Sequence, residues 1–295
     1  MGELCPTCII THVDRPFNIR VCALDSGICM QSVDESQAIE SFKQPNRVAW
    51  LHIVYQDRNA VSEFLEDALG FHELAVEDSL SDIERPTLHQ YDDHLFLSAS
   101  QVYSENAHEN YTEIGFFLTS SALVTVAPRE IPLVDSWIER WQKNPVHVGK
   151  RPVDLLHAVI DSVVDEYYLV AEKIEDEVDD LIDSISQGDN SQLQVLLNLK
   201  RRLNMLRRHV TPMRDIMNGL LRRDVTLIPA DSRADFQDVY DHTLRLTELA
   251  DINRDTLTST LDVHLSTVSN NLNNVMKKMT VMPRSEALSS AFISG

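Results

Sequence analysis

The side chains best suited to chemistry in this sequence are carboxylates. The 295-residue chain has 46 Asp and Glu against 26 Lys and Arg, which gives a net charge of −20. Mg²⁺ prefers oxygen ligands, keeps several of its waters and often needs only one or two protein carboxylates. The acidity therefore favours cations as partners and argues against nucleic acid, which requires basic patches. Any single acid can equally be a solvated surface group.

The other reactive side chains form no catalytic motif. The sequence lacks G-x-S-x-G, G-x-x-x-x-G-K and H-E-x-x-H. Cys5 and Cys8 have the spacing of half a zinc or redox site, whereas Cys22 and Cys29 fit no common metal spacing. We expect free thiols in a reducing compartment and a protein that is not an enzyme. If the protein is an enzyme, the alternative is a metal-dependent hydrolase.

The first half of the chain alternates between strand and helix patterns. Short apolar runs predict strands over residues 19–24, 48–55, 95–103, 111–118 and 122–127, and amphipathic patterns predict helices over residues 60–69, 74–80 and 131–142. Interleaved strands and helices imply an α/β layer sandwich. The closely spaced pair around Ser120 indicates a mixed sheet. We assign this sandwich domain to residues 1–150.

From about residue 151 the pattern is helical only. Residues 153–186 predict an acidic helix, and residues 193–223 predict a basic helix in which Pro212 introduces a kink. Gly188, Asp189 and Asn190 predict the turn between them. The two helices therefore form an antiparallel hairpin with complementary charges, assigned to residues 151–228. A phosphate or lipid site is the alternative reading of the basic run.

A long helix is predicted from Ser232 to Met282, because this stretch contains neither glycine nor proline. Its apolar residues step by four and three, as in the seam of a coiled coil: Leu261, Leu265, Val268, Leu272, Val275 and Met279. At 1.5 Å per residue it would be a rod of roughly 75 Å. From Val263 to Met276 no side chain is formally charged when His264 is counted as neutral, and Ser and Asn fill the polar positions, which suits helix–helix contact or a water-filled lumen. An ordinary polar coiled coil is the alternative.

Several of these stretches resemble the CorA family of magnesium channels. They are FHELAVEDSLSDIERPTLHQYDDHLFL (71–97), DLLHAVIDSVVDEYYLVAEKIEDEVDDL (154–181), LKRRLNMLRRHVTPMRDIM (199–217), and the segment from FQDVYDHTLRLTEL to STVSNNLNNVMK (236–277). They occur in the family's order and cover most of the chain. The predicted organisation, a sandwich, a hairpin and one stalk helix (229–282), is also that of the family. The fold class is therefore α+β.

The resemblance implies a homopentamer on the cytoplasmic face of the inner (plasma) membrane. It implies regulatory Mg²⁺ between neighbouring subunits, held by Glu77, Asp78, Asp161 and Asp238, with Asp78 and Asp238 as the central pair.

The resemblance also assigns residues to the pore. Asn273 matches a polar pore position, and Met276 and Met279 match the narrow apolar part.

The end of the chain departs from the family. There, an apolar membrane span and a Gly-Met-Asn loop should follow, but residues 278–295 read KMTVMPRSEALSSAFISG. Pro283, Arg284 and Glu286 cannot begin a membrane span. We expect that the chain stops before the membrane helices and ends in a foreign or altered tail (283–295); a naturally soluble relative is the alternative. No signal peptide and no stretch of about 20 apolar residues is visible.

The sequence thus predicts the cytoplasmic magnesium-sensing and gating domain of a CorA-type channel for Mg²⁺, with Co²⁺ or Ni²⁺ as further substrates. Two alternatives remain open: the corresponding domain of a related zinc transporter, and a soluble acidic oligomeric scaffold. Without the membrane helices, only weak self-association through the 261–279 seam is expected.

Overall fold

The computed structural model describes residues 16–24, 28–30, 34–44, 47–81, 85–105, 108–186, 192–222 and 224–289. The chain divides into two compact units. Unit 1 comprises Met1–Glu166 and Arg208–Leu244, and unit 2 comprises Tyr167–Arg207 and Arg245–Gly295.

Unit 1 is built on a seven-stranded mixed sheet. Its strands are β1 (Phe17–Ala23), β2 (Ile28–Met30), β3 (Ala49–Tyr55), β4 (Leu88–Gln90), β5 (Leu95–Glu105), β6 (His108–Leu118) and β7 (Ala122–Ala127). Their order is β2-β1-β3-β7-β6-β5-β4. The β3–β7 pair is parallel, and the other pairs are antiparallel. The predicted mixed sheet and α+β class are confirmed.

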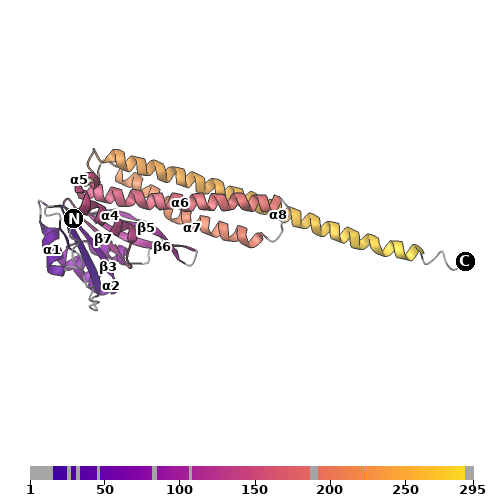
Figure 1. The fold of residues 1–295 in the computed structure, drawn as a ribbon, viewed down its shortest axis with the longest axis horizontal. Helices are drawn as coiled ribbons and strands as arrows, with labels where there is room; N and C mark the ends of the chain where they lie inside the picture. The colour runs from indigo at the N-terminus through magenta and orange to yellow at the C-terminus, as the bar shows by residue number, and fades with distance from the viewer. Residues whose placement is uncertain are drawn as a thin grey trace, which may run out of the picture. The chain divides into compact units, whose positions relative to one another are not determined.

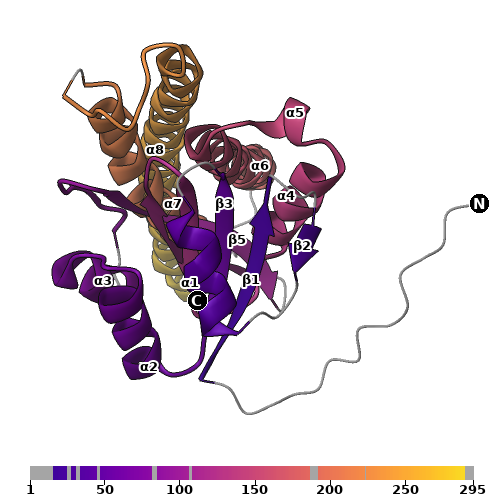
Figure 2. The same ribbon diagram turned by 90° about the vertical axis from the view of Figure 1, so that its left-hand side faces the viewer.

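One face of the sheet carries the main hydrophobic core. Because successive strand residues point to opposite faces, Leu51 and Ile53 of β3 lie on this side. Both are buried in one cluster with Phe64 and Val76. The covering elements are α1 (Glu35–Lys43), α2 (Arg58–Glu63), the π-helix η1 (Phe64–Ala68) and α3 (Glu73–Leu80), as Figure 2 shows.

The opposite face of the sheet packs against α4 (Pro132–Lys143) and the first part of α6 (Pro152–Ser186), and the single turn α5 (Pro145–Val148) between them has no buried residue. Trp50 of β3 points to this side, and its ring centroid lies 6.4 Å from that of Trp141 in α4. Nε1 of Trp137 donates a hydrogen bond of 2.9 Å to Oγ of Ser162 in α6. The sheet therefore lies between two helical layers, the predicted α/β/α sandwich.

The remaining helices are α7 (Leu193–Leu220) and α8 (Arg233–Ser289). In unit 1, Arg151 joins the start of α6 to the start of α8. Its Nη1 lies 2.9 Å from Oδ2 of Asp231, and its Nη2 donates to Oγ of Ser232 at 2.8 Å. The hydrogen bonds that Arg151 donates to Asp154 and Asp231 raise the pKa of its guanidinium. Ser232 immediately precedes α8, where the sequence places the helix start.

Unit 2 consists of segments of α6, α7 and α8 that run side by side (Figure 1). Nη1 of Arg202 in α7 lies 2.5 Å from Oε2 of Glu177 in α6. Nη2 of Arg207 lies 2.8 Å from Oδ1 of Asp251 in α8. The basic helix thus pairs with acids on both of its neighbours. The predicted turn at residues 188–190 lies outside the described residues.

Several local features differ from the sequence prediction. The short elements β2, α1, β4 and α5 were not predicted, and the expected helix over 60–69 is divided between α2 and η1. Pro212 lies inside α7, which continues past it. α8 extends to Ser289 rather than ending at Met282. No helix in the described part of the chain is both long and apolar enough to cross a membrane.

Candidate divalent-cation site

Two acids and a histidine converge where α6 meets α8 in unit 1. Asp161 and Asp165 are four residues apart on α6, so they lie on the same helix face. His242 reaches them from α8. One ligand atom from each of the three side chains lies within 4.8 Å of the others. We refer to these three residues as the Asp161 cluster.

Asp238 extends the Asp161 cluster along α8. It is one turn before His242, and its Oδ2 lies 3.8 Å from Nε2 of that histidine. The side chain of Asp238 is largely exposed, whereas Asp161 is half-buried. The cluster is therefore open to solvent on the Asp238 side.

The electrostatics of the cluster oppose a charged Asp161. Burial raises the pKa of Asp161, and the neighbouring carboxylates of Asp165 and Asp238 raise it further, while His157 and His242 lower it. A carboxyl that is half-buried among like charges is stabilised by a cation. The donor set suits a divalent cation, because carboxylate oxygens are the preferred ligands of Mg²⁺ and imidazole adds affinity for transition metals.

Glu77 and Asp78, the other two predicted ligands, lie on α3. Glu77 is exposed, and Oδ2 of Asp78 lies 3.4 Å from Nε2 of His89. Burial raises the pKa of Tyr91, and Asp78 raises it further. Within the described residues, neither Glu77 nor Asp78 joins a group of three potential metal ligands.

The structure thus brings two of the four predicted ligands, Asp161 and Asp238, into one electrostatic environment. It adds Asp165 and His242, which the sequence reasoning did not select. A signal for both was present, since Asp161 with Asp165 and Asp238 with His242 are pairs spaced by four residues on helices.

The predicted pore residues lie on the exposed part of α8. Asn273 is exposed, and Met276 and Met279 keep 60% and 70% of their accessible surface. Leu265 and Leu272 of the seam are also exposed, at 53% and 60%. In a single chain this row of apolar side chains is uncovered.

Of the cysteines singled out by spacing, Cys5 and Cys8 lie outside the described residues. Cys22 is buried in β1.

Both a family model and a curated relative match this chain over most of its length. Residues 45–283 match the family model described as CorA-like Mg2+ transporter protein. The cobalt/magnesium transport protein CorA of Thermotoga maritima is 30% identical over 250 residues, which are 83% of this chain and 71% of that protein.

Solved structures share the fold. The complete structure of the CorA magnesium transporter from Methanocaldococcus jannaschii superposes with a TM-score of 0.74 and 18% identity, covering 91% of this chain and 82% of that one. The ZntB cytoplasmic domain from Vibrio parahaemolyticus gives a TM-score of 0.69 and 17% identity, covering 87% of this chain and 100% of that one.

Proposed function

Because the chain belongs to the family of CorA-like Mg²⁺ transporter proteins, we propose that it is the magnesium-sensing and gating part of a divalent-cation channel. Family membership places it among transport proteins rather than enzymes. In this proposal Mg²⁺, and Co²⁺ as in the Thermotoga relative, are the transported ions. The chain acts as a homopentamer on the cytoplasmic face of the inner membrane.

The proposal assigns the sensor to acids from three parts of the chain. The sandwich domain (1–150) supplies Glu77 and Asp78, the hairpin (151–228) supplies Asp161, and the stalk (229–282) supplies Asp238. Within one chain, Asp78 shares no ligand cluster with Asp161 among the described residues. We therefore place Asp78 of one subunit opposite Asp238 of its neighbour, as the family resemblance implies.

Repulsion between these acids supplies the gating force. Like charges about 5 Å apart repel by about 3 kcal/mol at an effective dielectric near 20. Solvent exposure of Asp238 reduces this value. Repeated around a ring, the repulsion loosens the subunit interfaces. Bound Mg²⁺ would compensate the negative charges and so stabilise the closed ring. Because Mg²⁺ would bind the closed state more tightly than the open state, a high Mg²⁺ concentration would shut the channel.

The observation that carries the proposal is the convergence of Asp161, Asp165 and His242, with Asp238 one turn before His242 on α8. Burial raises the pKa of Asp161, and the carboxylates of Asp165 and Asp238 raise it further, so these acids disfavour one another's charge within a single chain. A chain that keeps the half-buried Asp161 beside the exposed carboxylates of Asp165 and Asp238, despite their repulsion, is suited to respond to a cation.

His242 supports a second candidate for the regulatory ion. Mg²⁺ binds chiefly to oxygen ligands, whereas an imidazole beside two carboxylates also suits Co²⁺ or Zn²⁺. A transition-metal regulator, as in a related zinc transporter, is therefore the alternative that this geometry favours. The soluble scaffold remains a further alternative without a specific observation in its support.

Sedimentation velocity of the chain with Mg²⁺, Co²⁺ or a chelator tests the proposal. We expect Mg²⁺ to promote association of the wild type and to have little effect on the Asp78→Asn, Asp238→Asn double variant. Association that Co²⁺ promotes and Mg²⁺ does not would favour the transition-metal alternative. If association is the same with Mg²⁺, with Co²⁺ and with the chelator, the sensor proposal is contradicted. The soluble scaffold is then the alternative that fits.

A further inference from the structure

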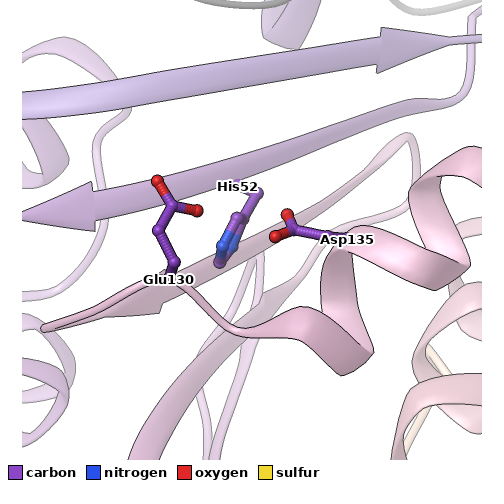
Figure 3. Close-up of side chains that lie close together, drawn as sticks. All are labelled: His52, Glu130 and Asp135. Atoms are coloured by element: carbon purple, nitrogen blue, oxygen red, sulfur yellow. The ribbon is translucent and has the colours of Figure 1, made fainter.

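A second group of potential ligands lies on the α4 side of the sheet, outside the proposed sensor. It consists of His52 on β3, Glu130 just before α4, and Asp135 in the first turn of α4. One ligand atom from each lies within 4.8 Å of the others. Figure 3 shows the imidazole of His52 between the two carboxylates. We call these three residues the His52 cluster.

The hydrogen bonds around His52 indicate which imidazole nitrogen carries the proton. Nδ1 of His52 lies 2.9 Å from Oγ1 of Thr125. That hydroxyl also accepts from Nε1 of Trp50 at 3.2 Å and donates to the carbonyl oxygen of Leu51 at 3.4 Å. Its remaining capacity is to accept, so the proton of the imidazole sits on Nδ1. Nε2 then carries the lone pair.

Nε2 of His52 is buried and has no hydrogen-bond partner among the described residues. The whole side chain is only 1% exposed. Burial, followed by the nearby Arg20, lowers the pKa of His52 to about 3, so the imidazole is neutral at pH 7. A buried acceptor without a donor is costly, and here the neighbouring groups are two carboxylates, which are also acceptors.

Arg20 compensates only part of the negative charge of the His52 cluster. Its Nη1 pairs with Oδ1 of Asp135, which leaves Oδ2 for a second partner. The pair neutralises one carboxylate, while Glu130 keeps a negative charge on the exposed side of the cluster. Three acceptors therefore converge with one net negative charge. A cation satisfies all three at once, whereas a water molecule has only two protons to donate.

We propose that His52, Glu130 and Asp135 form a binding site for a first-row divalent cation such as Zn²⁺. One imidazole nitrogen with two carboxylate oxygens is a donor set for Zn²⁺, Co²⁺ or Ni²⁺ rather than for Mg²⁺. Water on the Glu130 side would complete the coordination. Zn²⁺ ligands in a tetrahedral site lie about 3.3 Å from one another, so the ligand atoms, which lie within 4.8 Å of one another, would need to approach by up to about 1.5 Å.

Arg20 fits this site as a supporting residue. Groups that hydrogen-bond a ligating carboxylate fix its orientation, and Arg20 holds Asp135 through the oxygen that the cation would not use. A bound ion would link β3 to the start of α4 and so clamp α4 onto the sheet. The site would stabilise the sandwich and is independent of the proposed magnesium sensor.

The test is Zn²⁺ titration by calorimetry of the 295-residue chain in excess Mg²⁺, which fills sites made only of oxygen. The variants are Glu130→Gln at the site and Glu139→Gln as the control. Glu139 is an exposed acid on α4, and Glu130 lies just before that helix, so each substitution removes one negative charge from the same part of the chain. Asp165→Asn is measured in parallel, because the Asp161 cluster offers a similar donor set.

We expect wild type, Glu139→Gln and Asp165→Asn to retain one Zn²⁺ that Glu130→Gln binds at least tenfold more weakly. With Asp165→Asn present to weaken the Asp161 cluster, the Co²⁺ form should show an imidazole nitrogen in its X-ray absorption spectrum, and adding His52→Asn should remove that signal. Zn²⁺ should raise the unfolding temperature of wild type more than that of Glu130→Gln. Equal Zn²⁺ affinity in Glu130→Gln and wild type would overturn the site, whatever Asp165→Asn does. If Glu139→Gln weakens Zn²⁺ binding as much as Glu130→Gln does, the site is also overturned, because the loss would then reflect only the change in net charge.

Discussion

Oδ2 of Asp238 lies 3.8 Å from Nε2 of His242, one turn further along α8. His242 belongs to the same cluster as Asp161 and Asp165 on α6. The contact therefore connects an exposed carboxylate near the start of α8 to the half-buried Asp161 and the exposed Asp165 on α6. A change in the charge of this cluster therefore alters the electrostatic interaction between α6 and α8 within unit 1.

Asp161→Asn should stabilise the chain at neutral pH in the presence of a chelator. The pKa of Asp161 is raised in the folded state, so its charged form opposes folding above that pKa, and the penalty disappears as the pH falls through it. After allowance for solvent screening we expect a gain of about 0.5 kcal/mol. Chemical denaturation at pH 7 and pH 4 measures it.

The matched control for this experiment is Asp179→Asn, an exposed acid on the same helix. We expect this variant to change stability little at either pH. A loss of stability in Asp161→Asn at pH 7 without metal would mean that the carboxylate is held by favourable contacts rather than repelled.

His209→Phe should reduce the acid sensitivity of the chain. Burial, followed by Arg208, lowers the pKa of His209 to about 4, and its ring stacks on Tyr111 at 4.0 Å. The unfolded state binds the extra proton between about pH 6.5 and 4, so stability falls with falling pH in that window. The slope is about 1.4 kcal/mol per pH unit for one proton.

Phenylalanine preserves the stacked ring and removes the titration. The free energy of unfolding of His209→Phe should equal or exceed that of wild type at pH 7 and fall less on going to pH 5. Parallel pH profiles for the two proteins would show that His209 does not contribute to the acid response.

Glu177→Gln should weaken the packing of α6 against α7 in unit 2. Arg202 is mostly buried and lies 2.5 Å from Glu177, so this ion pair is less screened than a fully exposed one. We expect a loss of about 1 kcal/mol, measured by denaturant unfolding. Glu175→Gln, an exposed neighbour, should have no measurable effect, and an equal loss in both variants would argue against a specific pair.

Leu272→Asp should abolish self-association of the chain. Leu272 is 60% exposed in the middle of the 261–279 seam, where a second chain would cover it. Sedimentation equilibrium should show weak association for wild type and a monomer for the variant. Asn271→Asp adds the same charge at an exposed neighbouring position and should leave association intact. A wild type that remains monomeric at high concentration would rule out the seam as a self-contact.

The long helices of this fold could be predicted from the sequence, whereas its shortest strands could not. The apolar stripe of α6 and the uninterrupted helix after Ser232 extend over many turns, so their period is unambiguous. β2 and β4 have three residues each, too few for a pattern to emerge. The extension of α8 past Pro283 was missed because proline normally ends a helix.

The candidate site was partly predictable for a related reason. Asp161 and Asp238 were selected by family resemblance, which carries no information on the partners specific to this chain. Asp165 and His242 can be identified as potential ligands only when it is known which sides of α6 and α8 face each other. The His52 cluster could not be anticipated at all, because β3 and α4 are far apart in sequence and a lone histidine in an apolar strand suggests an ordinary core residue.

The most direct test of the proposed sensor is protection of the chain from proteolysis as a function of Mg²⁺ concentration. The comparison is between wild type, the Asp78→Asn, Asp238→Asn variant, and a control with Glu40→Gln and Asp262→Asn, which removes two exposed acids from the sandwich domain and the stalk. We predict that Mg²⁺ slows cleavage of wild type and control by at least tenfold. The cleavage rate of the Asp78, Asp238 variant should be largely independent of Mg²⁺. If that variant keeps the wild-type dependence on Mg²⁺, these two acids do not form the sensor.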